Sequence, residues 1–264
     1  MTPSPMSRAD KWTVSFDVDG LLVKNYFLSN VFPRVLKEYS KPLSRLDIEK
    51  QDELVSELKE IHERRLNGED PISALNWDEI VVELIPEASI SEKPISDLLK
   101  SELSREKPKI YPEVEDVLEE LTECGRINPV VLSNGYTSYQ ELVLEGSGLK
   151  DKFSRIYGPD VTNFLKPNPE TYRFIDEREE NYILHVGDKE VDVLGANSCN
   201  LTSWMVLRDL GIDQKKYLER RRKKDRRKIK NITDGLRPDF LSSSLIPAVD
   251  ILSAVGKYDL QDRL

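Results

Sequence analysis

Short apolar runs alternate along much of the chain with longer stretches in which apolar residues recur at helical spacing. The short runs are rich in β-branched and aromatic residues, which is typical of strands that are buried on both faces of a sheet. We therefore expect buried strands at residues 12–16, 129–132, 182–186, 203–207 and 239–241.

The amphipathic stretches predict helices between several of these strands. They lie at residues 112–124, 139–144, 169–178, 190–199 and 247–255. Gly125 and Asn200 follow two of them, and both residue types tolerate the positive φ of a helix C-cap. Because strands and helices alternate, the pattern predicts right-handed βαβ units and a parallel sheet of the α/β class.

Between the first two predicted strands lies a stretch of about 85 residues with helical patterns and no clear strand. Ser44 and Asp47 resemble a capping box at the start of one helix, which ends near Gly68. Two more helices are predicted at residues 77–84 and 95–103. We expect residues 24–108 to form an all-helical domain inserted into a core made of residues 1–23 and 109–264.

Composition excludes several classes of protein. The two cysteines are too few for a disulfide framework, and no Cys/His spacing indicates zinc. No window approaches the roughly 18 consecutive apolar residues that a membrane helix needs. Residues 1–10 lack the apolar run of a signal peptide. We therefore expect a cytoplasmic protein with no membrane partner.

The net charge of −9 argues against general binding of nucleic acid, because such a surface must neutralise phosphates with Lys and Arg. Residues 215–230 are an exception, since eleven Lys or Arg stand there beside two acids. Charge runs most often form solvated faces. The alternatives that stay open are a contact in a homo-oligomer, an acidic partner or a polyanion.

Candidate chemistry begins directly after the first predicted strand, in Asp17-Val18-Asp19-Gly20. In an open parallel sheet, ligands bind at the carboxyl ends of the strands. Two acids at that edge repel each other unless a cation or a proton intervenes, and a hard divalent ion with oxygen ligands is the simple solution. The same four residues are also ordinary turn chemistry, so the interpretation needs further residues.

Two segments that could bind phosphate follow later in the chain. Ser133 and Asn134 come after the predicted strand 129–132, where a hydroxyl and exposed amides can bind phosphate oxygens, although a simple turn gives the same pattern. Lys166 stands just before a helix, beside Pro167. A surface lysine is usually a solvated charge, but a fixed ammonium would balance several carboxylates and a phosphate.

A second pair of acids follows the predicted strand 182–186. Asp188 lies at the carboxyl end of that strand, and Asp192 is one turn into the next helix, on the same side. Asp192 could instead act only as a favourable charge near the helix N-terminus. The order and placement of all these residues are jointly more specific than any one of them.

In this order, the residues resemble the four motifs of the haloacid dehalogenase-like hydrolases. The motifs are Asp17-Val18-Asp19-Gly20, Ser133-Asn134, Lys166, and Gly187-Asp188 with Asp192. The resemblance implies an α/β fold with a Rossmann-like parallel sheet, helices on both faces and an inserted all-helical cap domain. Residues 24–108 match the family only in position, so the resemblance identifies no substrate-contacting residue there.

The resemblance also implies a role for each residue. Asp17 would attack phosphorus and form an aspartyl-phosphate, while Asp19 would protonate the leaving oxygen and later activate water. Mg²⁺ would be bound by the Asp17 and Asp188 side chains and the Asp19 carbonyl, with Asp192 in support. The phosphoryl oxygens would contact Ser133, the Asn134 amide and Lys166.

The sequence therefore predicts a magnesium-dependent phosphohydrolase that acts on a small phosphorylated substrate. A phosphatase is favoured over a haloacid dehalogenase because displacing an alkoxide needs a proton donor such as Asp19, whereas displacing a halide does not. Phosphomutase and pyrophosphatase chemistry are not separated from it. The alternative of another class is a non-catalytic binding or scaffold protein that uses the basic segment 215–230.

Overall fold

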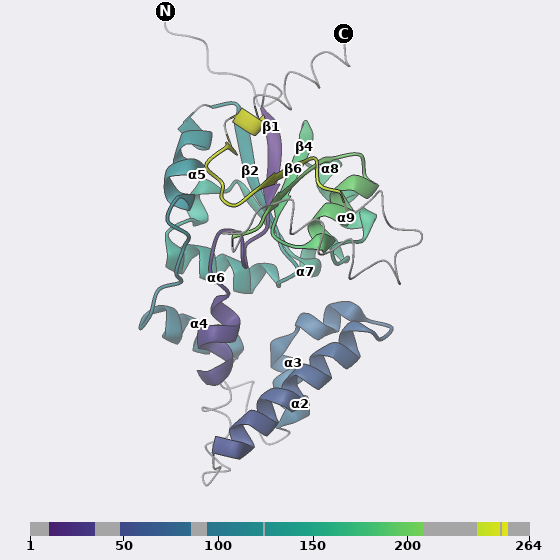
Figure 1. Cartoon of the computed structure of the whole chain (residues 1–264). Helices are drawn as coiled ribbons and strands as arrows, with labels where there is room; N and C mark the ends of the chain where they lie inside the picture. Colours follow the sequence, from purple (N-terminus) through teal and green to yellow (C-terminus); the bar gives the residue numbers. More distant parts are fainter. Residues whose placement is uncertain are drawn as a thin grey trace, which may run out of the picture.

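The computed structural model describes residues 11–34, 48–85, 94–123, 125–208, 237–248 and 250–252. Within them, six parallel strands form one sheet in the order β3-β2-β1-β4-β5-β6 (Figure 1). The strands are β1 (Trp12–Phe16), β2 (Ile127–Leu132), β3 (Arg155–Tyr157), β4 (Tyr182–Gly187), β5 (Thr202–Val206) and β6 (Phe240–Ser242). The fold is therefore α/β with a Rossmann-like parallel sheet.

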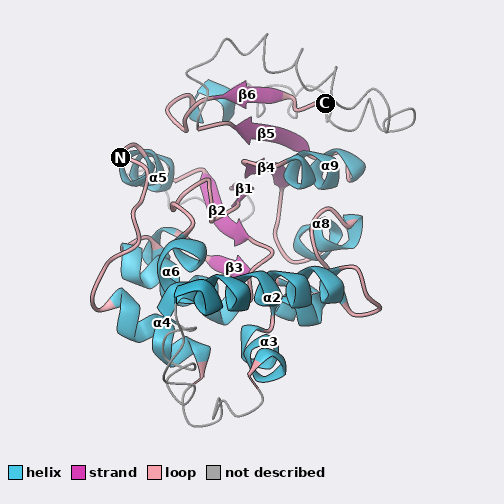
Figure 2. Cartoon of the chain, turned by 60° about the horizontal axis from the view of Figure 1, so that its bottom comes forward, coloured by secondary structure: helices cyan, strands magenta, loops and turns pink. Residues whose placement is uncertain are grey.

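Helices cover both faces of the sheet, as Figures 1 and 2 show. One side carries α5 (Val114–Glu123) and α6 (Thr137–Ser147), and the other carries α8 (Pro169–Asp176) and α9 (Glu190–Ser198). The short helix α7 (Pro159–Thr162) precedes α8. In α5 the apolar residues Val114, Val117, Leu118 and Leu121 share one face and are buried, so the helical spacing of the sequence fixes which side packs on the sheet.

The strand order places β1 at the centre of the sheet, paired with β2 on one side and β4 on the other. From β1 the chain goes to β2 and β3 on one side, and then to β4, β5 and β6 on the opposite side. The connections therefore reverse direction beside β1. In open α/β sheets, the crevice for ligands lies at the carboxyl ends of the strands where this reversal occurs. Asp17, the residue after β1, lies at that point.

Further helices lie beyond the carboxyl ends of the strands. After the π-helix η2 (Phe27–Val31) come α2 (Ile48–Leu66), the 3-10 helix η4 (Pro71–Leu75), α3 (Trp77–Leu84) and α4 (Ile95–Leu103). Figure 2 shows α2 and α3 in front of this end of the sheet. Leu58, Ile61 and Ile80 form a small apolar cluster between α2 and α3, separate from the main core. The boundaries 24–108 for a cap domain stay a prediction.

By contrast, α4 packs against the core. Its residues Ile95, Leu98 and Leu99 belong to the main apolar cluster that also contains Val143 of α6. Asp78 of α3 links these elements, because its carboxylate accepts a hydrogen bond from the Ile95 amide (2.6 Å) and lies 3.1 Å from the Tyr139 hydroxyl. The helices between β1 and β2 are thus joined to the core through α4 and through residues of η2 and α3 that belong to the same cluster, such as Phe27 and Val81.

Most of the local predictions are confirmed. The five predicted strands lie within two residues of their expected ends, and the helices predicted at residues 77–84 and 95–103 have those bounds. Gly125 and Asn200 have positive φ values of 69° and 57°, as expected for C-caps. The strand β3 was not predicted. It has only three residues at the sheet edge, one exposed, one half-buried and one buried, which give no apolar run.

Two predicted features lie outside the described residues. They are the capping box of Ser44 and Asp47 and the basic segment 215–230, whose suggested contacts stay predictions. The helix predicted at residues 247–255 is described only in part. None of the described helices is long and apolar enough to cross a membrane.

Candidate active site

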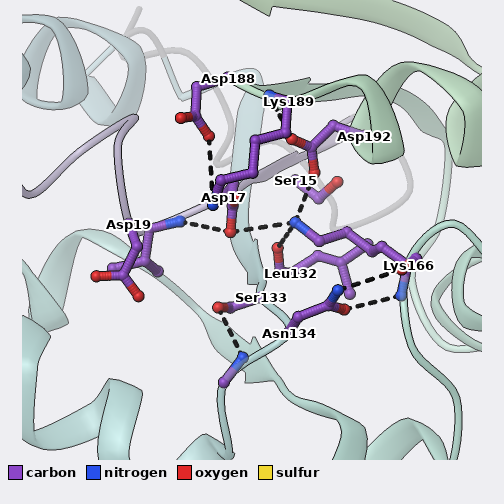
Figure 3. A network of polar contacts seen from close by, with 12 residues as sticks. Ser15, Asp17, Asp19, Leu132, Ser133, Asn134, Lys166, Asp188, Lys189 and Asp192 are labelled. Carbon is purple, nitrogen blue, oxygen red and sulfur yellow. Dashed lines mark hydrogen bonds and ion pairs between the residues drawn. The ribbon is translucent and has the colours of Figure 1, made fainter. Parts of the chain in front are cut away.

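A cavity of about 570 Å³ lies where the carboxyl ends of the strands meet the helices of residues 24–108. Five of the predicted site residues line it, although they come from three separate segments: Asp17, Asp19, Ser133, Asn134 and Lys166. Asp188 and Asp192 complete the group from β4 and α9 (Figure 3). The fold thus assembles all the residues that the sequence singled out at one edge of the sheet.

Asp17 is fixed at the end of the central strand. Its amide donates to the Val186 carbonyl at 2.9 Å, which continues the pairing of β1 with β4 by one residue. Its Oδ1 accepts a hydrogen bond from the Val18 amide (2.9 Å) and lies 3.1 Å from the Lys166 ammonium (Figure 3). These contacts orient a buried carboxylate toward the cavity.

Lys166 is the buried cation of the site. Its Nζ donates to the Leu132 carbonyl (3.1 Å) and forms ion pairs with Asp17 (3.1 Å) and Asp192 (2.6 Å). Burial alone would lower the pKa of this ammonium, but the neighbouring Asp17 and Asp192 carboxylates raise its pKa above the ordinary value. Lys166 is therefore charged and offsets part of the negative charge of these two carboxylates.

The backbone of Lys166 is fixed by Asn134. The Lys166 amide donates to Asn134 Oδ1 (2.8 Å), and Asn134 Nδ2 donates back to the Lys166 carbonyl (3.2 Å). The Asn134 side chain therefore ties the loop after β2 to the loop before α8. Ser133 lies beside it and accepts a hydrogen bond from the Gly135 amide (3.1 Å). The Ser133 hydroxyl hydrogen remains available for a phosphate oxygen, because a hydroxyl can accept and donate together.

Asp192 forms hydrogen bonds through both carboxylate oxygens. Oδ1 lies 2.6 Å from Lys166 Nζ and 3.1 Å from His185 Nε2, while Oδ2 accepts the Lys189 amide (3.0 Å). Burial alone would raise the pKa of Asp192, but Lys166 and His185 bring this pKa far below its usual value. Asp192 is therefore ionised and orients Lys166. Its role goes beyond that of a favourable charge at a helix N-terminus.

A series of buried hydrogen bonds supports Asp192 from inside the sheet. His185 Nδ1 lies 2.7 Å from the Ser15 hydroxyl, and the Ser15 hydroxyl lies 2.6 Å from that of Tyr182. Burial lowers the pKa of His185, so the ring is neutral, and Nε2 must carry its hydrogen because a carboxylate only accepts. Tyr182 then donates to Ser15, Ser15 to His185, and His185 to Asp192.

No motif in the sequence pointed to these hydrogen-bonded residues. Their signal is a polar residue inside an apolar strand, at Ser15 in β1 and at His185 in β4. The pairing of β1 with β4 places these two residues directly opposite each other. Only the sheet register could reveal that they act together.

The acids at the strand ends could bind a divalent metal ion. Asp17, Asp188 and Asp192 each offer a carboxylate oxygen, and these oxygens lie within 4.8 Å of one another. Oδ1 of Asp188 is buried without a hydrogen-bond donor among the described residues, since the Lys189 ammonium is 4.0 Å away. Burial raises the pKa of Asp188 to about 6, which shows how poorly its charge is compensated by the protein alone. The residues fit a hard cation such as Mg²⁺.

Gly20 provides the space that Asp188 occupies. Its φ is +91°, and a Cβ on this residue would lie 2.2 Å from Asp188 Oδ2. We predict that Gly20→Ala displaces Asp188 and raises the Mg²⁺ concentration for half-maximal activity by about 10- to 100-fold, as changes beside metal ligands typically do. Titration calorimetry with Mg²⁺ should show the same weakening. Gly148→Ala is the control, because Gly148 also has positive φ (+79°) but open space around it.

Asp19 lies in the same cavity as Asp17 and is half-buried. Oδ2 accepts a hydrogen bond from Gln140 Nε2 (3.1 Å), and Oδ1 is buried with no partner in the described part of the chain. Burial raises the pKa of Asp19, which favours the protonated form and hence a proton donor. Gln140 was missed in the sequence, where it is only a polar residue within an amphipathic helix.

A Rossmann-like sheet with acids after β1 and β4 and helices inserted after β1 defines a class of proteins with known structures. The chain resembles the HAD phosphatase from Thermococcus onnurineus (22% identity, TM-score 0.64, covering 92% of this chain and 97% of that chain). It also resembles the 2-haloacid dehalogenase from Pseudomonas syringae pv. Tomato DC3000 (17%, 0.62, 92% and 99%) and the L-2-haloacid dehalogenase from Xanthobacter autotrophicus (18%, 0.56, 92% and 98%). At these identities the similarity establishes the fold.

The family follows from the sequence itself. The model of the haloacid dehalogenase-like hydrolases matches residues 13–200, which is more than half of the chain. A search of curated proteins found no match. The chain belongs to the haloacid dehalogenase-like hydrolase family, and the resemblance drawn from its motifs is confirmed.

Proposed function

We propose that this hydrolase is a magnesium-dependent phosphatase that cleaves small phosphate monoesters through an aspartyl-phosphate on Asp17. The observation that carries the proposal is Asp19, whose half-buried carboxyl group lies in the same cavity as Asp17 and has a raised pKa. An ester needs a proton on its leaving oxygen, and this carboxyl group can supply one.

In the first step Asp17 attacks phosphorus and the bond to the leaving oxygen breaks. The Val18 amide and Lys166 both contact Oδ1 of Asp17, so we assign the attack to Oδ2. Lys166 and the Ser133 hydroxyl lie in the same cavity and would contact the phosphoryl oxygens, together with the Asn134 amide. Because these groups are already oriented by hydrogen bonds, little reorganisation is needed when charge develops.

Asp19 acts in both steps. It gives its proton to the departing alkoxide, and as a carboxylate it then takes a proton from the water that attacks the aspartyl-phosphate. Gln140 orients this carboxyl group through its hydrogen bond to Oδ2. The second step returns the Asp17 carboxylate, releases phosphate and restores the proton on Asp19.

The side chains of Asp17 and Asp188 and the Asp19 carbonyl would bind Mg²⁺, with the Asp192 carboxylate in support from beside them, directly or through water. When bound, the ion supplies positive charge that neutralises the phosphate and the acids around it. The protein alone offers less positive than negative charge in this part of the cavity. Among the described residues that line or adjoin it, the ammonium groups of Lys166 and Lys189 stand beside four carboxyl groups, those of Asp17, Asp19, Asp188 and Asp192.

The experiment compares two products. We expect the purified full chain with Mg²⁺ to release phosphate from 2-phenylethyl phosphate and 4-nitrophenyl phosphate, and no chloride from 2-chloropropionate. Chloride needs no proton as it leaves, so a dehalogenase would not use Asp19 as a proton donor. Chloride release above background, with phosphate release that does not respond to Mg²⁺ or chelator, would replace the phosphatase by a dehalogenase.

A further inference from the structure

The cavity has a second wall that the catalytic proposal does not use. It is formed by residues of η2, α2, η4 and α3 and of the segments next to them, and it faces the acids across the cavity. Six apolar residues line it: Phe27, Phe32, Pro33, Leu58, Leu75 and Trp77. A site that bound only a phosphoryl group would have no use for such a surface.

Aromatic rings follow one another along this wall. Tyr139 of α6 lies 5.8 Å from Phe27 between ring centroids, Phe27 lies 5.9 Å from Phe32, and Phe32 lies 4.3 Å from Trp77. The His62 ring stacks on Trp77 at 5.1 Å. Each ring is fixed by its neighbours, so the wall is preorganised and cannot collapse easily into the cavity.

The size of the cavity indicates a ligand larger than phosphate. Protein interiors are close-packed, and an apolar cavity of about 150 Å³ is already large enough to bind benzene. The volume here is about 570 Å³, shared between the acids and the aromatic wall. A phosphoryl group beside Asp17 therefore leaves space for a leaving group that contains a ring.

The polar groups on this wall are few. Lys59 is the single residue of permanent charge among the described residues that line it, beside Asn25 and His62. His62 donates from Nδ1 to the Ala74 carbonyl (2.7 Å), since a carbonyl only accepts, and this bond fixes the ring against Trp77. A sugar or polyol needs several hydrogen-bond partners when it is buried, and this wall offers too few.

We propose that the substrate is a phosphate monoester whose leaving group is apolar and carries an aromatic ring, which packs against Phe27, Phe32 and Trp77. This inference rests on the proposed phosphatase for the chemistry of the phosphoryl end. The helices between β1 and β2 recognise the apolar leaving group. The acids of the core contact only the phosphoryl group and the leaving oxygen.

Binding of inert analogues tests the inference separately from turnover. Titration calorimetry of the full chain with Mg²⁺ should compare 2-phenylethylphosphonate with ethylphosphonate, which differ only by the ring. We expect the ring to tighten Kd by at least about tenfold, the effect typical of burying such a group in an apolar pocket. A ring that adds less than about threefold, or no binding of either analogue, would overturn the inference.

Variants then test whether the ring of the analogue binds at the aromatic wall. Leu75→Gln puts an amide of similar size at a lining position and should reduce the ratio of the two Kd values by at least about fivefold. Val82→Gln is the matched control, since Val82 lies on α3 of the same helical unit with 42% of its surface exposed, and its ratio should equal that of the parent. Equal ratios in all three proteins would place the ring elsewhere. Tight binding of the aromatic phosphonate without hydrolysis of any ester would reject the phosphatase and keep the inference.

Discussion

Turnover of phosphate esters is expected to fall by at least ~10³ when Asp17 is replaced by asparagine, because the change removes both the nucleophile and a metal ligand. The amide is nearly the same size as the carboxylate and can still accept from the Val18 amide and Lys166, so the fold should persist. The parent and Asp17→Asn should be compared at saturating substrate and Mg²⁺. Asp151→Asn, at an exposed acid outside the cavity, is the control.

A second measurement addresses the intermediate itself. Rapid acid quench during turnover should give the parent a phosphoryl group on the peptide that contains residue 17, and Asp17→Asn should give none. Near-parental turnover in Asp17→Asn, or a phosphoryl group on another residue, would contradict the mechanism.

Replacement of Asp19 by asparagine is the second large effect that we expect. General acid/base catalysis is typically worth 10²–10⁴-fold, and the loss should depend on the leaving group. 2-Phenylethyl phosphate has a poor alkoxide leaving group that needs the proton, so its phosphoryl transfer to Asp17 should slow strongly. The nitrophenolate of 4-nitrophenyl phosphate needs little protonation, so its first step should change much less. Breakdown of the aspartyl-phosphate should slow for both esters, because the same base activates water.

Single-turnover experiments separate these two steps. The burst of 4-nitrophenol reports the first step, and the decay of the acid-stable phosphoprotein reports the second. Gln140→Leu is a useful companion, since it removes only the hydrogen bond that orients Asp19 and should have a smaller effect of the same kind. Equal losses in the first step for both esters would reject Asp19 as the proton donor.

Much of the fold could be predicted because its signals are local. The apolar run of β1 and the amphipathic spacing of α3 and α4 lie within single segments, and their predicted bounds agree with the structure. The edge strand β3 could not be predicted, because three residues, of which only Tyr157 is buried, carry no pattern and their pairing with β2 depends on the rest of the sheet. The limits of the helical insertion stay a prediction for a related reason. Its α4 packs on the core, so neither sequence pattern nor packing marks a single boundary.

For the site, the sequence by itself determined which residue types stand at the strand ends, since a parallel α/β sheet delivers its carboxyl ends to one edge. That placement singled out Asp17, Asp19, Ser133 and Asp188 as candidates. Lys166, which precedes a helix, was added by charge balance and by the resemblance to the family. Tertiary structure alone decided how these residues are oriented. The bonds between Asn134 and Lys166 join positions 32 residues apart, and the contact from Gln140 to Asp19 spans 121.

Tertiary structure alone also decided the contacts of the buried residues that support the acids and of the aromatic wall that faces them. Ser15 supports His185 only because β1 and β4 pair in one particular register, and a shift by one residue would turn Ser15 to the other face. Phe27 and Trp77 share the aromatic wall only because η2 and α3 meet beyond the sheet. Such contacts depend on packing between segments that are distant in sequence. Residue types and their spacing therefore determined which functional groups are present, whereas the packed fold decided their geometry and formed the apolar cavity beside them.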